Sequence, residues 1–304
     1  MSKRLTYFTP TYNRAHTLPA VYESMCRQTN KDFIWLIIDD GSKDDTKSIV
    51  EGWQAENKIK IQYYLKQNGG KHTAIELSNQ VCETEYINCV DSDDYLADDS
   101  TEILIKYLDE VSNDKELCGI VSRRAHYDGS PFNESFPNTS EKLYFGDLAT
   151  KYGYTQDTNL IFKTDLVKNF HFPIFEDERF VTESVFYNQF MLDYKMLAIP
   201  ECLYLAEYQE DGYTAQGMRL FYKNPKGYLY CLKQEVVVGM RKKVGLLRLV
   251  KRTAIYLAYK KVFNAKEVMP EFKIPFVYRL LGGNVLKWIY QCKYNKGYKL
   301  FLKG

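Results

Sequence analysis

The sequence has no apolar run long enough to form a membrane-spanning helix. Its longest stretches without a charged side chain are nine residues each, Leu5–Asn13 and Ser184–Leu192, whereas a spanning helix needs about 20 mostly apolar residues. The apolar run near the N-terminus is too short for a signal peptide. These absences predict a soluble chain.

Cysteine and histidine patterns that indicate disulfide frameworks or zinc sites are also missing. The seven cysteines are scattered without a Cys-x-x-Cys pair, and the four histidines form no His-Glu-x-x-His pattern. An odd number of cysteines without zinc spacing is typical of reduced thiols inside a cell. The sequence therefore predicts a cytoplasmic protein.

What the sequence does have is a large apolar fraction and an uneven distribution of charge. Hydrophobic residues make up 45% of the 304 residues and aromatic residues 15%, which excludes wholesale disorder. Residues 1–212 contain 21 basic and 36 acidic side chains, and residues 213–304 contain 20 and 3, so the two parts carry net charges of −15 and +17. This asymmetry predicts two parts that face different partners.

Apolar runs of strand length alternate with helical periodicity through the first part. The expected strands are Leu5–Thr9, Phe33–Ile38, Ile59–Leu65, Tyr86–Val90, Cys118–Ser122, Asn159–Lys163 and Leu203–Tyr208. The expected helices are Leu18–Cys26, Asp44–Trp53, Thr73–Cys82, Ser100–Val111 and Thr182–Leu192. Residues 124–158 are less regular. The alternation predicts an α/β fold, a Rossmann-like and mainly parallel sheet flanked by helices, followed by a basic helical extension.

Polar clusters follow the first, second and fourth expected strands. They are Thr9-Pro-Thr-Tyr-Asn-Arg14, Asp39-Asp-Gly-Ser42 and Asp91-Ser-Asp-Asp94. Ligands bind outside the carboxyl ends of strands in such sheets, and carboxylates at i and i+2 suit a hard cation such as Mg²⁺ or Mn²⁺. Each cluster alone is better explained as a turn or a helix cap. Three clusters at corresponding strand ends predict a ligand-binding crevice.

Together with Asn68-Gly-Gly-Lys-His72, these clusters resemble the successive signatures of family 2 glycosyltransferases, which have the GT-A fold. The resemblance implies a catalytic domain over residues 1–212, with a nucleotide-sugar half at about 1–100 and an acceptor half at about 101–212. It also implies a nucleotide-sugar donor, most often a UDP-sugar, and Mn²⁺ or Mg²⁺ as cofactor.

The same resemblance assigns the residues that hold the uracil. Tyr12 and the backbone around Thr9 and Pro10 contact the base, and Asp40 accepts a hydrogen bond from its ring N–H.

The diphosphate and the metal are assigned to the later signatures. Lys71 lies near the nucleotide, and His72 is either a neighbour of the diphosphate or a loop residue. Asp91 reaches the ribose or a metal-bound water, and Asp93 ligates the metal. This chemistry needs a cation because a nucleoside diphosphate leaves only when its growing negative charge is neutralised.

Transfer with inversion also needs a base to take the proton of the acceptor hydroxyl. Many relatives carry Glu-Asp at the start of a late helix, with the Asp as base, but this sequence has Glu183-Ser184 there. Serine cannot replace a carboxylate, so we predict Glu183 as the base, with Asp177 and Glu178 as substitutes. The alternative is that Thr182 caps the helix and Glu183 only favours its positive N-terminal end.

The C-terminal part combines cations with aromatic side chains. A basic amphipathic helix with aromatic flanks is typical of a membrane-surface element, to which each cation near an anionic leaflet contributes about 1 kcal/mol. The alternatives are a lid on the acidic domain and an oligomer interface. Resemblance to bacterial family members implies a growing glycan acceptor on a polyprenyl-diphosphate carrier, in capsule, exopolysaccharide or O-antigen synthesis. It places the protein peripherally on the cytoplasmic face of the inner membrane.

Three other functions fit the sequence less well. A sugar-nucleotide pyrophosphorylase needs a Gly-rich phosphate loop after the first strand, and residues 9–14 are not one. A nucleic-acid-binding protein would leave Asp91–Asp94 unexplained and would lack an RNA-binding signature, so no nucleic-acid partner is expected. A noncatalytic family member is favoured only by Ser184.

Overall fold

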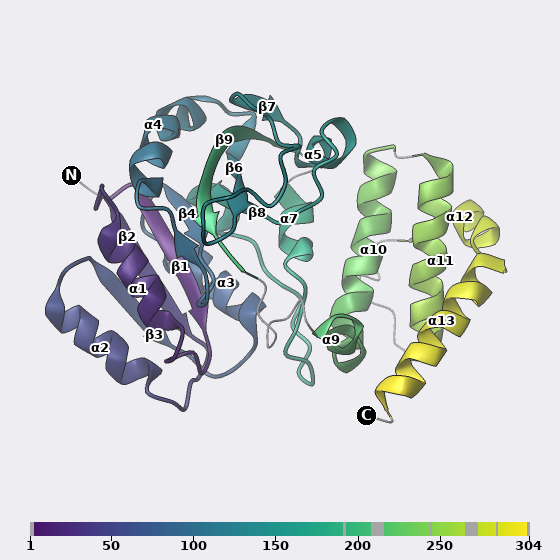
Figure 1. Ribbon diagram of the computed structural model, residues 1–304. Coiled ribbons are helices and arrows are strands. Elements are labelled where there is room, and N and C mark those ends of the chain that lie inside the picture. Colours follow the sequence, from purple (N-terminus) through teal and green to yellow (C-terminus); the bar gives the residue numbers. More distant parts are fainter. Residues whose placement is uncertain are drawn as a thin grey trace. The chain divides into compact units, whose positions relative to one another are not determined.

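The computed structural model describes residues 3–190, 193–207, 216–243, 245–264, 273–283 and 285–302. The chain divides into two compact units, Met1–His171 with Asp193–Tyr208, and Phe172–Leu192 with Gln209–Gly304. The first unit contains the sheet and the second is helical (Figure 1). The boundary expected at residue 212 lies outside the described residues. Residues 172–192, which the sequence analysis grouped with the N-terminal domain, cluster with the C-terminal helices.

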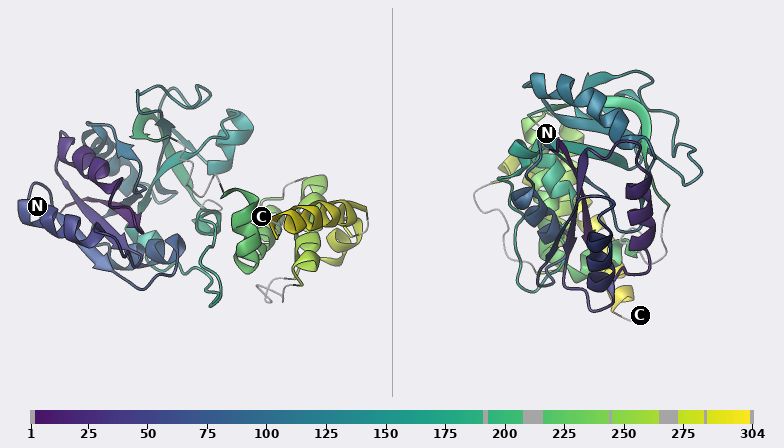
Figure 2. Two further views of the ribbon diagram at one scale, coloured as in Figure 1. Left: turned by 60° about the horizontal axis from the view of Figure 1, so that its bottom comes forward. Right: turned by 90° about the vertical axis from the view of Figure 1, so that its left-hand side faces the viewer.

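The described residues of the first unit form a mixed sheet of nine strands (Figures 1 and 2). The strands are β1 (Leu5–Thr11), β2 (Phe33–Asp39), β3 (Ile61–Leu65), β4 (Tyr86–Cys89), β5 (Tyr95–Leu96), β6 (Leu117–Ala125), β7 (Glu141–Leu143), β8 (Thr158–Lys163) and β9 (Lys195–Leu205). Their order is β3-β2-β1-β4-β8-β6-β9-β5, with β7 also paired to β9. The sheet confirms the predicted GT-A-like α/β class.

The parallel arrangement holds where the alternation was most regular. Strands β1 to β4 are all parallel to their neighbours in this group, but β8 runs antiparallel to both β4 and β6. β5 and β7 run antiparallel to β9, which is itself parallel to β6. The sheet is therefore mixed rather than mainly parallel, because β5, β7 and β8 run antiparallel to their neighbours.

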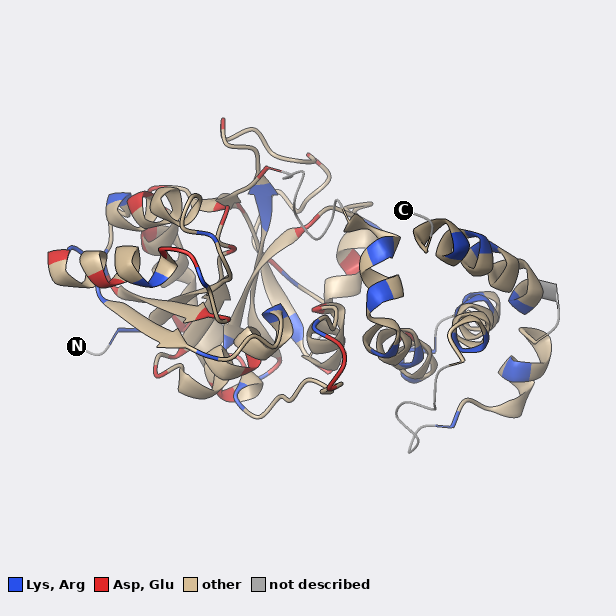
Figure 3. Cartoon of the chain, turned by 90° about the horizontal axis from the view of Figure 1, so that it is seen from below, with Lys and Arg blue, Asp and Glu red and all other residues tan. Residues whose placement is uncertain are grey.

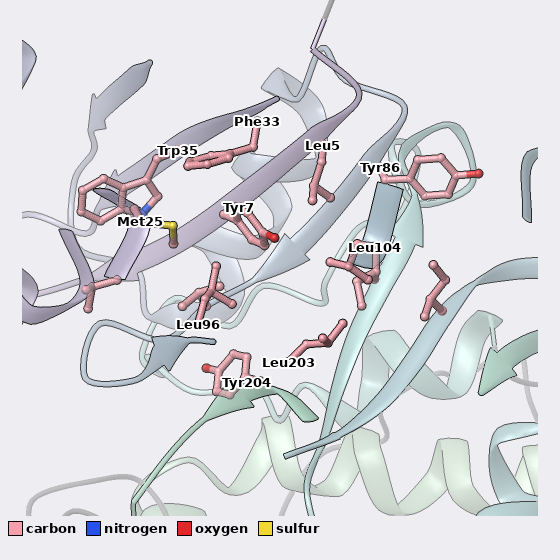
Figure 4. Packing of buried hydrophobic residues seen from close by; sticks show 14 of the residues in the cluster. Leu5, Tyr7, Met25, Phe33, Trp35, Tyr86, Leu96, Leu104, Leu203 and Tyr204 are labelled. Carbon is pink, nitrogen blue, oxygen red and sulfur yellow. The ribbon is translucent and has the colours of Figure 1, made fainter. Parts of the chain in front are cut away.

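The helices of this unit are α1 (Leu18–Arg27), α2 (Thr46–Glu56), α3 (Lys71–Val81), α4 (Ser100–Asn113), α5 (Phe145–Lys151) and α6 (Thr164–Val167). Periodic apolar residues explain their packing, since α1 buries Leu18, Val21 and Met25 against the sheet. Figure 4 shows Met25 beside Trp35 of β2 in the hydrophobic core. This core fixes the strands whose ends carry the polar clusters.

Strand β1 is longer than expected. Thr9–Thr11 continue the parallel ladder opposite Ile37–Asp39, and all seven residues of β1 are buried. The prediction ended the strand at Thr9 and placed residues 9–14 in a turn. Instead, Thr9 Oγ1 accepts a hydrogen bond from Trp35 Nε1 at 2.9 Å inside the core. Tyr12 is therefore the first residue beyond the strand.

The second unit confirms the predicted helical extension. Its helices are α7 (Ser184–Phe190), α9 (Met218–Lys223), α10 (Pro225–Arg241), α11 (Leu246–Val262), α12 (Phe276–Leu281) and α13 (Val285–Phe301). Leu229 and Val236 of α10 pack with Tyr256 and Tyr259 of α11 and Tyr294 of α13. No helix in the described ranges is long and apolar enough to cross a membrane.

Candidate active site

The clusters after β1 and β2 are joined by hydrogen bonds. The Asn13 N–H donates to Ser42 Oγ at 2.8 Å, and Asn13 Oδ1 accepts from the Lys43 N–H at 2.8 Å. Asn13 has a φ of 52°, in the left-handed region that asparagine tolerates. The exposed fraction of Tyr12 is 45%, the highest of any aromatic residue of the first unit that is described as exposed. The structure thus leaves the Tyr12 ring accessible at a rigid strand end.

Asp40 anchors the loop that leads into α3. Its Oδ2 accepts a hydrogen bond from the Gly70 N–H at 2.7 Å, and its Oδ1 accepts one from the Gly69 N–H at 2.9 Å. The Lys66 ammonium lies 2.5 Å from Oδ1. Gly70 has a φ of 94°, so the loop needs glycine there. Sequence reasoning missed Lys66 and this structural role, although the Gly-Gly pair signalled a close approach of backbone.

The loop after β4 meets the start of α3. Lys71 Nζ lies 2.6 Å from Asp91 Oδ1, so two residues predicted near the nucleotide form an ion pair. Burial alone would raise the pKa of Asp91, but the nearby cations Lys71 and Arg124 outweigh it and hold the pKa below its ordinary value. His72 is buried in the first turn of α3. The carboxylate of Asp91 is therefore ionised at neutral pH.

Asp93 and Asp94 differ in their surroundings. Burial and the neighbouring Asp91 charge raise the pKa of Asp93. Asp94 is more buried, and its Oδ2 accepts a hydrogen bond from the Tyr204 hydroxyl at 2.7 Å. Burial, followed by the Asp91 charge, raises the pKa of Asp94 to about 7, although Arg124 lies 3.6 Å away. Asp94 therefore titrates near neutral pH.

Arg124, Tyr127 and Tyr204 are site residues that the sequence did not reveal. The Tyr127 hydroxyl donates to the Asp93 carbonyl at 2.8 Å, and its ring centroid lies 4.5 Å from that of Tyr95. Arg124 and Tyr204 lie on β6 and β9, far from the Asp91–Asp94 signature in sequence. No local pattern marks such residues, because only strand pairing brings them to the turn.

Glu207 is the last residue described after β9. Its Oε1 lies 3.0 Å from His126 Nδ1.

The acidic residues fit a divalent cation that also binds substrate. Within the described ranges, no three His, Cys, Asp or Glu side chains are grouped to hold a metal by themselves. Mg²⁺ and similar hard cations are commonly held by one or two carboxylates together with substrate phosphates. Asp91 and Asp93 supply oxygen donors of this kind. The residues present therefore suit a metal that arrives with a diphosphate.

The three candidate bases lie in the second unit. Both Glu178 carboxylate oxygens accept backbone N–H groups of α10, from Lys226 and Gly227, each at 2.8 Å. Burial raises the pKa of Glu178 in spite of these two hydrogen bonds. Asp177 Oδ1 pairs with Lys226 Nζ at 2.5 Å. Both residues are thus engaged at the beginning of α10.

Glu183 accepts a hydrogen bond from a side-chain hydroxyl, whereas Glu178 accepts hydrogen bonds from backbone N–H groups. Glu183 Oε2 accepts a hydrogen bond from the Tyr187 hydroxyl at 2.5 Å, one turn along α7. The Ser184 N–H lies 3.4 Å from Thr182 Oγ1, a long hydrogen bond of the kind expected for a weak cap. Glu183 is half-buried.

Comparison with known proteins gives one family. The model for glycosyl transferase family 2 matches residues 6–171. The chain is 24% identical over 220 residues to glycosyltransferase GlyG of Streptococcus pneumoniae, covering 67% of this chain and 71% of GlyG. It is 31% identical over 124 residues to chondroitin synthase of Escherichia coli, covering 41% of this chain but only 18% of that larger protein.

Solved structures share the fold. Residues 1–349 of TarS from S. aureus, in complex with UDP-GlcNAc, superimpose with a TM-score of 0.65 at 20% identity, covering 86% of this chain and 73% of that one. A mannosyltransferase from Pyrobaculum calidifontis, with GDP-Man and Mn²⁺, gives a TM-score of 0.56 at 15% identity, covering 96% and 86%. Since the family model spans more than half of the 304 residues, the chain belongs to glycosyl transferase family 2 and is a nucleotide-sugar glycosyltransferase.

Proposed function

We propose that the protein is an inverting, metal-dependent glycosyltransferase that moves a hexosyl or N-acetylhexosaminyl group from a UDP-sugar to a hydroxyl of a growing glycan. The observation that carries the proposal is the Lys71–Asp91 ion pair beside Asp93 at the end of β4. This arrangement combines a cation for phosphate with carboxylates for metal. The TarS complex with UDP-GlcNAc supports a UDP-linked donor, and the mannosyltransferase complex supports Mn²⁺.

In this proposal, residues at the ends of β1 and β2 and at the start of α3 bind the nucleotide of the donor. The exposed ring of Tyr12 stacks on the uracil, and the backbone around Thr9 and Pro10 contacts the same base. Asp40 keeps the glycine loop in place, and its Oδ2 retains a lone pair for a base N–H. Lys71 balances the diphosphate. A hydrogen-bonded loop on a rigid sheet lowers the entropy cost of holding the nucleotide.

The metal would be held by Asp93, with Asp91 contacting it directly or through water. When bound, Mn²⁺ or Mg²⁺ neutralises the charge that develops on the leaving diphosphate. The chain's own part is to keep both carboxylates charged and correctly aimed. Lys71 and Arg124 keep the Asp91 carboxylate charged, because they hold its pKa below the ordinary value.

Glu183 is the proposed base for the acceptor hydroxyl. A half-buried carboxylate that accepts a hydrogen bond from the Tyr187 hydroxyl is a group that can take a proton as the acceptor hydroxyl attacks. Glu178 is a weaker candidate because α10 occupies both of its oxygens. Glu183→Gln should abolish transfer while UDP binding persists, and Glu176→Gln is the matched control on a neighbouring exposed carboxylate. Near-normal turnover of Glu183→Gln would remove Glu183 from this role.

The donor assignment can be tested without knowing the acceptor. Thermal unfolding is followed with UDP, ADP or GDP, each with and without Mn²⁺. A nucleotide at 100 times its dissociation constant stabilises the native state by about 2.7 kcal/mol. We expect a Mn²⁺-dependent rise in melting temperature with UDP alone. No rise with any nucleotide would contradict the proposal.

We also propose that the C-terminal helices bind the anionic cytoplasmic leaflet, where a polyprenyl-diphosphate-linked acceptor is anchored. Helix α12 has no buried residue, and four of its apolar side chains are 50–74% exposed: Phe276, Val277, Leu280 and Leu281. Figure 3 shows that the charged positions of the C-terminal helices are almost all basic. Exposed apolar side chains among cations are what interfacial helices present to anionic lipid.

Membrane binding is measured by co-sedimentation with phosphatidylglycerol vesicles at low salt. The double variant Phe276→Ser/Leu280→Ser should lose binding, whereas Leu65→Ser, which changes an exposed apolar residue of the first unit, should retain it. If the intact protein ignores these vesicles, a lid or an oligomer interface becomes the better explanation.

A further inference from the structure

The Asp91–Asp94 turn is fastened by a tyrosine from the far end of the domain sequence. The Tyr204 hydroxyl accepts a hydrogen bond from the Asp91 N–H at 2.9 Å and donates one to Asp94 Oδ2 at 2.7 Å. One hydroxyl therefore joins both ends of the turn. It contacts the backbone of Asp91 and the side chain of Asp94, not the two carboxylates proposed to meet the metal.

Tyr204 itself has little freedom to move. Its side chain is fully buried, and it pairs with Leu96 of β5 on one side and Arg124 of β6 on the other. Figure 4 shows the ring in the core cluster with Leu96 and Leu203. The Arg124 guanidinium lies over the ring, 4.2 Å from its centroid. Because β5, β6 and Arg124 hold Tyr204 in place, the sheet fixes the position of its hydroxyl. The hydroxyl in turn fixes the Asp91–Asp94 turn.

A second tyrosine fastens the middle of the turn. The Tyr127 hydroxyl donates to the Asp93 carbonyl, and the ring packs against Tyr95. The backbone of Tyr127 is held in a tight turn, in which the Gly129 N–H donates to the His126 carbonyl at 2.9 Å. Asp91, Asp93 and Asp94 are thus each bonded to a tyrosine hydroxyl.

We propose that Tyr204, assisted by Tyr127, is a positioning residue that aims the Asp91 and Asp93 carboxylates at the divalent cation. The inference rests on the proposed metal-dependent function. Residues that orient metal ligands affect metal affinity by about 10–100-fold when they are changed. Two carboxylates separated by one residue can share a cation only if the backbone between them has a fixed path, and these hydroxyl contacts fix that path.

The test compares Tyr204→Phe with Tyr86→Phe. Tyr86 is a matched control, because it is also a buried sheet tyrosine whose hydroxyl has two partners, Ser112 Oγ at 2.7 Å and the Leu108 carbonyl at 3.0 Å. Both variants lose two hydrogen bonds. The measurement is the Mn²⁺ concentration that gives half of the UDP-induced rise in melting temperature. A merely structural role lowers the melting temperature without changing this concentration.

We expect Tyr204→Phe to raise the half-saturating Mn²⁺ concentration at least tenfold, and Tyr86→Phe to leave it within about twofold of the wild-type value. Tyr127→Phe changes a partly exposed residue, so it keeps the test valid if Tyr204→Phe does not fold, and it should raise the concentration about threefold. Unchanged Mn²⁺ dependence in Tyr204→Phe, or in Tyr127→Phe if that is the variant that folds, would overturn the inference. Absence of any UDP and Mn²⁺ response in the wild type would instead overturn the proposed function.

Discussion

A substitution at Glu178 can distinguish a carboxylate that stabilises the fold from one that takes part in sugar transfer. The Glu178 side chain is buried and binds two backbone N–H groups in the first turn of α10. These donors have no partner within the helix, and a carboxylate there also interacts favourably with the helix dipole. We expect Glu178 to stabilise the second unit and to contribute little to the chemistry of transfer.

The expected loss of stability in Glu178→Gln follows from the two hydrogen bonds that the carboxylate accepts. In Glu178→Gln, one oxygen remains an acceptor, while the new NH₂ group faces a backbone donor that loses its partner. A hydrogen bond to a charged group contributes about 1.5–3 kcal/mol, and an unsatisfied buried donor costs about 1–3 kcal/mol. The penalty for burying the carboxylate, seen in the raised pKa, offsets part of this. We therefore expect a loss of about 2 kcal/mol, or about 4–8 °C in melting temperature.

The assay combines calorimetry with sugar transfer measured well below the melting temperature. Glu178→Gln should melt earlier but retain transfer within about threefold of the wild-type rate, because about 2 kcal/mol leaves a domain of ordinary stability mostly folded. Asp177→Asn, which removes an exposed ion pair to Lys226, should melt within about 1 °C of the wild type. A Glu178→Gln variant with unchanged melting and no transfer would refute this reasoning and make Glu178 the base.

Three further predictions concern the first unit. Asp40→Asn should lower stability by about 2–3 kcal/mol and weaken UDP binding, measured by calorimetry, because Lys66 loses its carboxylate and a glycine N–H loses its acceptor. Gly119→Ala should cost about 3 kcal/mol or more in urea unfolding, since an added Cβ would lie 1.8 Å from the Ile161 carbonyl oxygen. Asp94→Asn should stabilise the metal-free protein more at pH 8 than at pH 4, measured by urea unfolding. The folded pKa of about 7 exceeds the ordinary carboxyl value of 3.8, so native Asp94 holds its proton between these values and stability falls as pH rises.

The sequence predicted the fold and the candidate site best where they depend on residues that are adjacent in the chain. The apolar run Phe33–Ile38 became a fully buried strand, and the clusters after β1 and β2 became neighbours because the strands are parallel and adjacent. Tyr204 and Arg124 could not be found in this way, since their contacts with the Asp91–Asp94 turn depend on which distant strands pair. For the same reason, the grouping of residues 172–192 with the C-terminal helices was not visible in local periodicity.

The charges around the Asp91–Asp94 turn explain why two cations are built into a site that is proposed to bind a third. Three carboxylates within four residues repel one another, and burial strengthens that repulsion. Lys71 and Arg124 compensate two of them, and Asp94, with a pKa of about 7, is only partly ionised at neutral pH. The turn therefore carries at most one net negative charge, and a divalent cation would make it positive. A positive site suits a diphosphate, whereas three uncompensated carboxylates would bind the cation and still repel the donor. The fixed cations thus favour metal and nucleotide binding together over metal binding alone.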